Sequence, residues 1–336
     1  MKKKRPETEP KLTWAEIKDN KPIGLFIIAN IYALASVLGI LLFNAWPDMH
    51  FIWRIAIAAA AATVFVYLTG LIFQNASVYD PYWSVAPLVV FSGFAVHVGV
   101  VSQGTPLLLL AVWFWGLRLT RNWAYTFKNL ATQDWRYDNF KQRFPRLYPI
   151  ISLFGIHLFP TLVVYLCMLP GIALMQNYFF NIFTVLGFAV CVGATILQLI
   201  ADRQMYQFRR KDKDRQGIIR VGLWKHARHP NYLGEILMWW GVYGMMLSVA
   251  PRLWFLGLGA LVNTLMFLFI SIPMADKRNR ANKPGFAEYV RETNHLLPFR
   301  LKRQVKGSRG QGAGDRDQET APDPAVSALP FLPPDL

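Results

Sequence analysis

Hydrophobic residues gather along the chain into eight continuous runs separated by polar linkers. The runs are 23–44, 52–73, 84–101, 105–119, 150–171, 179–200, 233–250 and 253–273. Most approach the ~20 apolar residues that an α-helix needs to cross a bilayer, and they lack the alternation of a barrel strand. The pattern predicts an all-α, polytopic membrane protein with about eight transmembrane helices. The third and fourth runs are shorter and are expected to tilt or to form a re-entrant pair.

Composition supports the membrane assignment, and the charge distribution gives an orientation. Of the 336 residues, 54% are hydrophobic and only 17% are charged, yet the net charge is +16. Lysine and arginine gather before the first run, in 118–146, in 203–228 and after the last run. With eight spans these segments share one side, which the positive-inside rule makes cytosolic together with both termini. Nucleic-acid binding is disfavoured because no recognisable module accompanies the charge.

Three parts are expected along the chain. Residues 1–22 form a polar, basic cytosolic arm without a cleavable signal, and 23–300 form a membrane-embedded domain. Residues 301–336 are rich in Gly, Asp, Pro and Ala and are predicted to be a disordered tail. Cys167 and Cys191 fall inside apolar runs, which indicates small buried hydrophobic residues and neither a disulfide nor a thiolate metal site.

The stretch Gly222–Glu235, GLWKHARHPNYLGE, places many polar side chains against the start of a hydrophobic run. Pro230 restricts the preceding residue to extended backbone and suits the first position of a helix. In that helix Glu235 lies one turn after Asn231 and Tyr232, so the three side chains can face one pocket.

The same stretch has the character of an anion site. The unpaired amides of a helix start, with Arg228, Lys225 and His226 beside them, suit a ligand such as a diphosphate. The alternative is a basic loop among lipid headgroups, but headgroup binding requires no Asn, Tyr or intramembrane Glu.

Two shorter motifs carry an aspartate among aromatic residues. Asp80-Pro81-Tyr82-Trp83 can orient a hydrogen-bond donor toward a carbonyl, or it can be a turn before proline within an interfacial aromatic belt. Asp134-Trp135-Arg136-Tyr137 holds either a surface ion pair, worth ~1 kcal/mol or less, or part of a cytosolic cofactor cradle.

Asp202 and Gln198 lie one helical turn apart at the end of the sixth run. A carboxylate there can hold a ribose or an amide, and the basic residues 209–213 can meet phosphate or act as an ordinary stop-transfer cluster. His97 and His157 are isolated in apolar runs, with no second ligand at i+3 or i+4, so no local metal motif is predicted.

Together these motifs resemble the steroid 5-alpha-reductase family, in particular its branch of incompletely characterised multi-pass membrane proteins. The resemblance covers roughly residues 60–300. Its motifs are Asp80–Trp83, Asp134–Tyr137, Ala201–Gln204, Gly222–Trp224 with Arg228–Tyr232 and Glu235, and Phe286–Tyr289 with Leu297-Pro298.

This resemblance implies an NADPH-dependent reductase of a carbon–carbon double bond in a lipid or sterol-like enone, with a membrane lipid as substrate. The implied cofactor contacts are Asp202, Trp224, Arg228, His229, Asn231, Tyr232, Glu235, Arg278 and Tyr289. No clear counterpart occurs of the Glu or Gln and Tyr that steroid-specific reductases place against the ketone, so Asp80 and Tyr82 are assigned that role.

Reduction of an enone creates an enolate, which a hydrogen-bond donor stabilises in a dry site. A tyrosine donates without carrying a charge, which favours Tyr82, Tyr137 or Tyr232 over a lysine.

Two other classes of function remain open from the sequence. Arg-His-Pro-x-Tyr followed by Gly and Glu is also similar to membrane methyltransferases that use S-adenosylmethionine on isoprenylated cysteines or phospholipids. A non-enzymatic lipid-binding protein or a transporter is the third class, although no internal repeat of a transporter is evident. The expected location is the inner membrane in a bacterium or the endoplasmic reticulum in a eukaryote.

Overall fold

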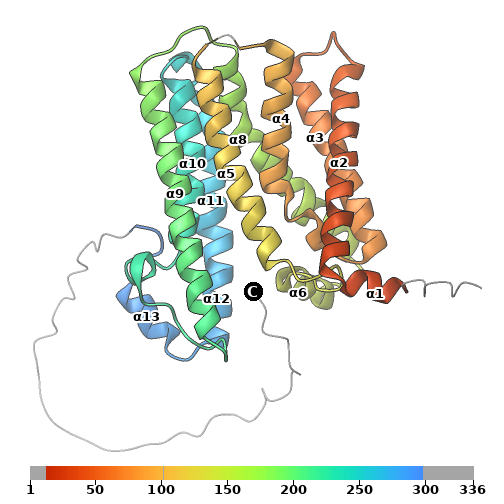
Figure 1. The fold of residues 1–336 in the computed structure, drawn as a ribbon, viewed down its shortest axis with the longest axis vertical. Helices are drawn as coiled ribbons and strands as arrows, with labels where there is room; N and C mark the ends of the chain where they lie inside the picture. Colours follow the sequence, from red (N-terminus) through yellow and green to blue (C-terminus); the bar gives the residue numbers. More distant parts are fainter. Residues whose placement is uncertain (1–12, 101, 298–336) are drawn as a thin grey trace, which may run out of the picture.

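The computed structural model describes residues 13–100 and 102–297, and within them the chain is all-α. Long helices stand side by side as a bundle, and short helices gather at one end, here called the polar end (Figure 1). Residues 1–12 of the predicted arm and the whole predicted tail lie outside the described residues. The elements are α1 (Trp14–Asp19), α2 (Lys21–Ala45), α3 (Phe51–Phe73), η1 (Ala76–Tyr79), α4 (Tyr82–Val98), α5 (Gly104–Thr126), α6 (Trp135–Arg143), α7 (Tyr148–Ile151), η2 (Ser152–Leu158), α8 (Phe159–Met175), α9 (Ile182–Lys211), η3 (Gly222–Lys225), α10 (Pro230–Leu247), η4 (Pro251–Gly257), α11 (Leu258–Met266), η5 (Phe267–Ser271), α12 (Ile272–Asn282) and α13 (Phe286–Glu292).

Every predicted run forms a helix, and in the described part of the chain six helical segments are long and apolar enough to cross a membrane. They are Lys21–Ala45, Phe51–Phe73, Ala76–Val98, Tyr148–Met175, Ile182–Lys211 and Pro251–Asn282. These segments indicate a multi-pass membrane protein.

The remaining two predicted spans are the long helices α5 and α10, which run beside the six (Figure 1). α5 carries Arg118 and Arg121, and α10 begins with Asn231 and Glu235, so neither is apolar along its whole length. The runs expected to be short are separate helices that pack together, α4 with 17 residues and α5 with 23.

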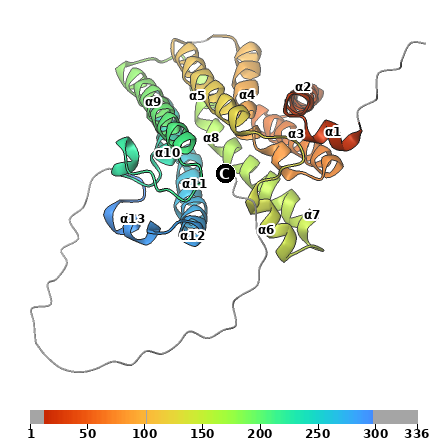
Figure 2. The same ribbon diagram turned by 60° about the horizontal axis from the view of Figure 1, so that its bottom comes forward.

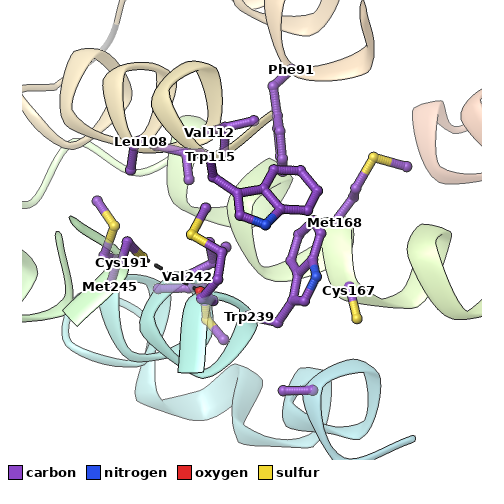
Figure 3. Packing of buried hydrophobic residues seen from close by; sticks show 14 of the residues in the cluster. Phe91, Leu108, Val112, Trp115, Cys167, Met168, Cys191, Trp239, Val242 and Met245 are labelled. Carbon is purple, nitrogen blue, oxygen red and sulfur yellow. Dashed lines mark hydrogen bonds between the residues drawn. The ribbon is translucent and has the colours of Figure 1, made fainter. Parts of the chain in front are cut away.

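The main core forms where α4, α5, α8, α9 and α10 meet (Figure 3). Trp115 is fully buried there and packs edge-on against Trp239, with ring centroids 5.2 Å apart. Cys167 and Cys191 are free and buried in the same cluster, as the sequence predicts. A second core joins α2, α3 and η1, where the Tyr32 hydroxyl donates to backbone carbonyls of η1.

Glycines bring the backbones of α9 and α10 almost into contact. A Cβ added at Gly234 would lie 2.7 Å from the carbonyl oxygen of Ala194, and one at Gly241 would lie 3.0 Å from the amide nitrogen of Cys191. Small residues at a helix interface allow this approach. The contact fixes the register of the two helices and places Gln198 of α9 beside the first turns of α10.

At the polar end the short helices form two groups (Figure 2). α6 and α7 lie beside the α2–α3 part of the bundle, and η3 and α13 lie beside α9 and α12. The two groups meet where the Arg278 guanidinium of α12 lies 4.6 Å from the ring centroid of Trp135 in α6.

Candidate functional site

The loop before α10 is tied to the C-terminal segment of the described chain. The helix start at Pro230 is confirmed. The indole of Trp224 donates to the carbonyl of Ala201 at 3.1 Å, and the Tyr289 hydroxyl donates to the carbonyl of Trp224 at 2.5 Å. The amide of Arg228 donates to the carbonyl of Asn294 at 2.9 Å in an isolated parallel bridge. Trp224 and Tyr289 therefore hold the loop in place.

Arg228 and His229 form a buried cluster with Asp276 of α12. The Arg228 guanidinium lies 3.2 Å from Asp276 and donates to the carbonyl of Thr293 at 2.6 Å. Nε2 of His229 lies 2.9 Å from the other carboxylate oxygen of Asp276. Only 4% of Arg228 is exposed. The sequence suggested that Arg228, Lys225 and His226 flank an anion. The structure directs Arg228 to protein groups, while Lys225 and His226 are exposed.

Glu235 is bound by three donors, two from the neighbouring helices α5 and α9 and one from the next turn of α10. The indole of Trp115 and the amide of Gln198 each donate to one carboxylate oxygen at 2.8 Å, and the indole of Trp239 donates to the other at 3.1 Å. Three hydrogen bonds fix the position of the carboxylate. Glu235 therefore orients Gln198, and Gln198 also contacts the carbonyl of Asn231 at 3.4 Å.

Three buried polar atoms around this network have no hydrogen-bond partner among the described residues. They are Nε of Arg118, Oε1 of Gln198 and Oδ1 of Asn231. Arg118 pairs with Asp202 at 2.5 Å, one turn along α9 from Gln198. Buried polar atoms without partners are uncommon in native proteins and indicate a ligand or ordered water. The three atoms offer two acceptors and one donor, which complements a carboxamide.

Further along α9 toward the polar end, basic side chains converge. Burial lowers the pKa of Lys283, Arg209 of α9 and Arg278 of α12 lower it further, and Asp212 opposes them. Arg278 in turn lies within electrostatic reach of Asp134, Arg209 and Arg136. Mutual repulsion among cations is relieved by an anion between them. Gln198, Asp202 and Arg209 lie on one stripe of α9 that spans eleven residues, about 16 Å.

The predicted aspartate motifs meet at the α6 side of the polar end. The Tyr137 hydroxyl donates to Asp80 at 2.8 Å, and Arg136 pairs with Asp134 at 2.8 Å. Burial raises the pKa of Tyr137, and the charge of Asp80 adds to the shift. Tyr82 is separate from this pair, since its hydroxyl donates to the carbonyl of Ala59 in the second core at 3.1 Å.

Tyr232 is the predicted tyrosine whose hydroxyl has no hydrogen-bond partner among the described residues. Its ring stacks on His229 with centroids 5.1 Å apart and 6° between the planes, and it contacts Phe267 at 4.9 Å. Arg136 and Asp134 lie within electrostatic reach of the hydroxyl. The ring is therefore held rigidly while the hydroxyl remains available to a ligand.

The structure thus brings Asp202, Asn231 and Glu235 together, and it places Tyr232 beside His229. Sequence reasoning missed Trp115 and Lys283, and it left Arg118 and Arg209 without an assigned partner. The available signal was Arg118, a charged residue between two leucines of an apolar helix. Among the described residues no group of three or more His, Cys, Asp and Glu side chains is arranged to hold a metal ion.

The fold and the site define an all-α, multi-pass membrane protein with a buried polar network near the polar end. The chain belongs to the family described as "Protein of unknown function (DUF1295)", whose model matches residues 66–293. It is also similar to an uncharacterized protein of Schizosaccharomyces pombe, with 24% identity over 199 residues, 51% of this chain and 57% of the relative. The chain thus matches only a little over half the length of that relative. No solved structure matches the chain.

Proposed function

We propose that the chain is an integral-membrane, NADPH-dependent reductase that acts on a carbon–carbon double bond of a membrane lipid, with an enone as the preferred substrate class. The observation that carries the proposal is the set of unpartnered atoms on Arg118, Gln198 and Asn231. A nicotinamide carboxamide supplies an NH₂ group for the two amide oxygens and a carbonyl for Nε of Arg118.

The basic side chains along α9 and α12 support a phosphate-bearing cofactor. One end of the α9 stripe carries the basic group of Arg209, Arg278 and Lys283, and the other end carries the unpartnered amides. The two groups are therefore about 16 Å apart along the helix. An extended dinucleotide places its amide and its phosphates at opposite ends in the same way. S-adenosylmethionine carries no phosphate and has a cationic sulfonium, so this group of cations favours NADPH over the methyl donor.

Tyr232 supports the reductive chemistry. A bound NADPH would supply the hydride, and the reduced enone would develop negative charge on its carbonyl oxygen. The rigid ring of Tyr232 would hold a neutral O–H donor at that oxygen, where hydrogen bonding stabilises charge most effectively in a water-poor site. Asp276 keeps His229 in place beneath the ring, so it positions Tyr232 through His229.

The resemblance to steroid 5-alpha-reductases supports the same reading of the residues. In this proposal Asp202 and Asn231 contact the cofactor, and Arg228, His229, Trp224 and Tyr289 build the loop that surrounds it. Tyr137 and the Asp80 that accepts from its hydroxyl lie on the substrate side, while Tyr82 supports the scaffold from the second core.

Titration of the purified full chain in detergent with NADPH and with S-adenosylmethionine tests the proposal. We expect saturable binding of NADPH that weakens as salt is added. Asn231→Ala should weaken it by roughly tenfold or more, the effect of one buried hydrogen bond to a ligand. Lys283→Gln should weaken it several-fold, whereas Lys277→Gln, an exposed neighbour on α12, should leave it unchanged.

Binding of the methyl donor without a response to NADPH would replace the proposal with the methyltransferase alternative. Binding of neither compound would favour the non-enzymatic alternative. If NADPH binds, incubation of the holoprotein with membrane lipid extracts should yield lipids heavier by two hydrogen atoms, and Tyr232→Phe should slow their formation with little change in NADPH affinity.

A further inference from the structure

A pocket lies on the other flank of the polar end, between the end of α3, α6 and the start of the Tyr148–Met175 segment. Its cavity volume is about 160 Å³, far more than the ~10–15 Å³ that a single water requires. The lining residues are Tyr67, Gly70, Leu71, Gln74, Asn75, Ala76, Gln133, Lys141, Tyr148, Ser152 and His157. None of them belongs to α9, α10 or α12, so this pocket is separate from the proposed cofactor site.

His157 gives the pocket its chemistry. Its ring is 1% exposed and packs against the rings of Tyr67 and Tyr79. Nδ1 lies 2.7 Å from the carbonyl oxygen of Ser152, and because a carbonyl only accepts, Nδ1 must carry the hydrogen. In the neutral ring Nε2 is then the acceptor, and it has no hydrogen-bond partner among the described residues.

The local helix geometry explains this orientation. Ser152–Leu158 is a π-helix, in which the amide of Phe159 donates to the carbonyl of Phe154. Pro160 follows, and it has no N–H for the carbonyl of Ile156. The wider turn brings His157 within reach of the carbonyl five residues earlier. Such π-helical turns are frequent at functional sites.

One charged side chain lines the pocket, Lys141 of α6, which lies one turn after Asp138. Lys141 of α6 is exposed, and it has no ion-pair partner among the described residues. Gln133 is already used, since its carbonyl oxygen accepts from the amide of Ala76 at 2.7 Å and its NH₂ group donates to Asp138 at 2.8 Å. A ligand that satisfies both free groups has a hydroxyl for Nε2 of His157 and an anionic group for Lys141.

The surroundings favour a lipid as the source of these groups. Large apolar side chains are exposed beside the pocket on α3 and on the Tyr148–Met175 segment. These are Leu71 at 46%, Ile72 at 65%, Ile150 at 58% and Phe154 at 60% exposure. In a membrane protein such side chains contact acyl chains, so a headgroup in the pocket would have its tails on an apolar surface.

We propose that this pocket binds a polyol phosphate, with a hydroxyl donating to Nε2 of His157 and the phosphate pairing with Lys141. The group comes either from a glycerol-phosphate lipid headgroup or from a free polyol phosphate. No residue of the proposed cofactor site takes part in this pocket, and its lining residues Ala76 and Tyr148 pack in one cluster with Tyr137 on the substrate side.

Native mass spectrometry of the full chain in micelles doped with phosphatidylglycerol tests the proposal. One saturable phosphatidylglycerol per chain is expected. His157→Leu should weaken it by roughly tenfold, as expected for the loss of one buried hydrogen bond. Lys141→Gln should weaken it several-fold, whereas Arg143→Gln, the same charge change on the same helix outside the pocket, should have no effect.

Two further experiments show whether the ligand is a lipid or a soluble polyol phosphate, and whether its hydroxyl groups are recognised. Competition by free glycerol phosphate identifies the soluble polyol as a ligand, and its failure to compete identifies the lipid. Phosphatidic acid, which lacks the headgroup polyol, should bind several-fold more weakly. Equal binding of phosphatidic acid, absence of saturable binding, or equal effects of the Lys141 and Arg143 variants would overturn the proposal. If His157→Leu does not fold, these comparisons still decide the outcome.

Discussion

Two neighbouring parts of the Arg228–Glu235 stretch, the pair Arg228–His229 and the residue Asn231, differ in whether their polar atoms have hydrogen-bond partners. Arg228 and His229, the charged end, contact Asp276 and backbone carbonyls of the C-terminal segment. Asn231, one residue into α10, keeps an unpartnered side-chain oxygen beside Gln198. A charged residue in a loop would ordinarily be the first candidate for ligand binding, yet here the charges build the frame and the neutral amides remain available.

This difference follows from the energetics of burial. A buried ion requires a partner at all times, because its desolvation costs several kcal/mol whether or not a ligand is present. An unpartnered amide oxygen costs only about 1–3 kcal/mol, which a ligand can return on binding. The frame and the ligand-facing groups should therefore respond differently to mutation.

Removal of Asp276 should give the largest effect. Asp276→Ala leaves the Arg228 guanidinium buried without its carboxylate, and we expect a loss of about 3–5 kcal/mol of stability. Thermal unfolding in detergent measures this, and Lys277→Ala is the exposed control on the same helix. A loss no larger than the control's would show that the cluster does not hold the C-terminal segment.

Alkaline pH should weaken the same frame. Burial raises the pKa of Tyr289 to about 12, above the ~10 of an unfolded tyrosine. The unfolded chain then loses its proton first, so this contribution is complete below about pH 10 and lost between about pH 10 and 12, up to about 3 kcal/mol. Stability measured against pH for the wild type and Tyr289→Phe should converge over that window. Parallel curves would contradict the assignment.

Separation of α9 from α10 should have an intermediate effect. In Gly234→Ala the new Cβ would lie 2.7 Å from the carbonyl of Ala194, so the helices must move apart at a cost of about 1–3 kcal/mol. Gly244→Ala is the matched control, since a Cβ there meets nothing within 4 Å and should stabilise the helix slightly. If both variants unfold at the same temperature, the close contact does not set the register.

Asn231→Ala should have the smallest effect on the ligand-free protein. The substitution loses the packing of the side chain but also removes an unpartnered buried oxygen, and because these two contributions oppose each other we expect a net change within about 1 kcal/mol. Thermal unfolding without ligand measures this change. A small change in stability together with the roughly tenfold loss of NADPH affinity predicted above would show that Asn231 acts on binding, whereas Asp276 acts on stability. A large loss of stability would make Asn231 part of the frame.

Hydrophobic pattern predicted most of the fold. All the apolar runs form helices, and α10 starts at Pro230, because both features depend on local sequence. The limits appear at α5 and α10, where Arg118 and Glu235 interrupt otherwise apolar helices. Their partners, Asp202 and Trp115, come from other helices, and no local pattern indicates such contacts.

The site was predicted less completely for the same reason. Asn231, Tyr232 and Glu235 were expected to face one pocket. Asn231 and Glu235 both contact Gln198, whereas the ring of Tyr232 stacks on His229. The expectation for Arg228 rested on its place beside a helix start, whereas its position is decided by Asp276, 48 residues later. The pairing of Tyr137 with Asp80 likewise joins residues 57 positions apart. Separations of this length become visible only when the helices are packed.

The contact between Arg278 and the indole of Trp135 gives the protein an internal optical reporter. A guanidinium 4.6 Å from the ring centroid perturbs the excited state of that indole. An anion that draws Arg278 toward Arg209 and Lys283 would change the distance and with it the emission. The difference spectrum between the wild type and Trp135→Phe would isolate this signal from that of the other tryptophans, and it would follow ligand entry in real time without an added dye.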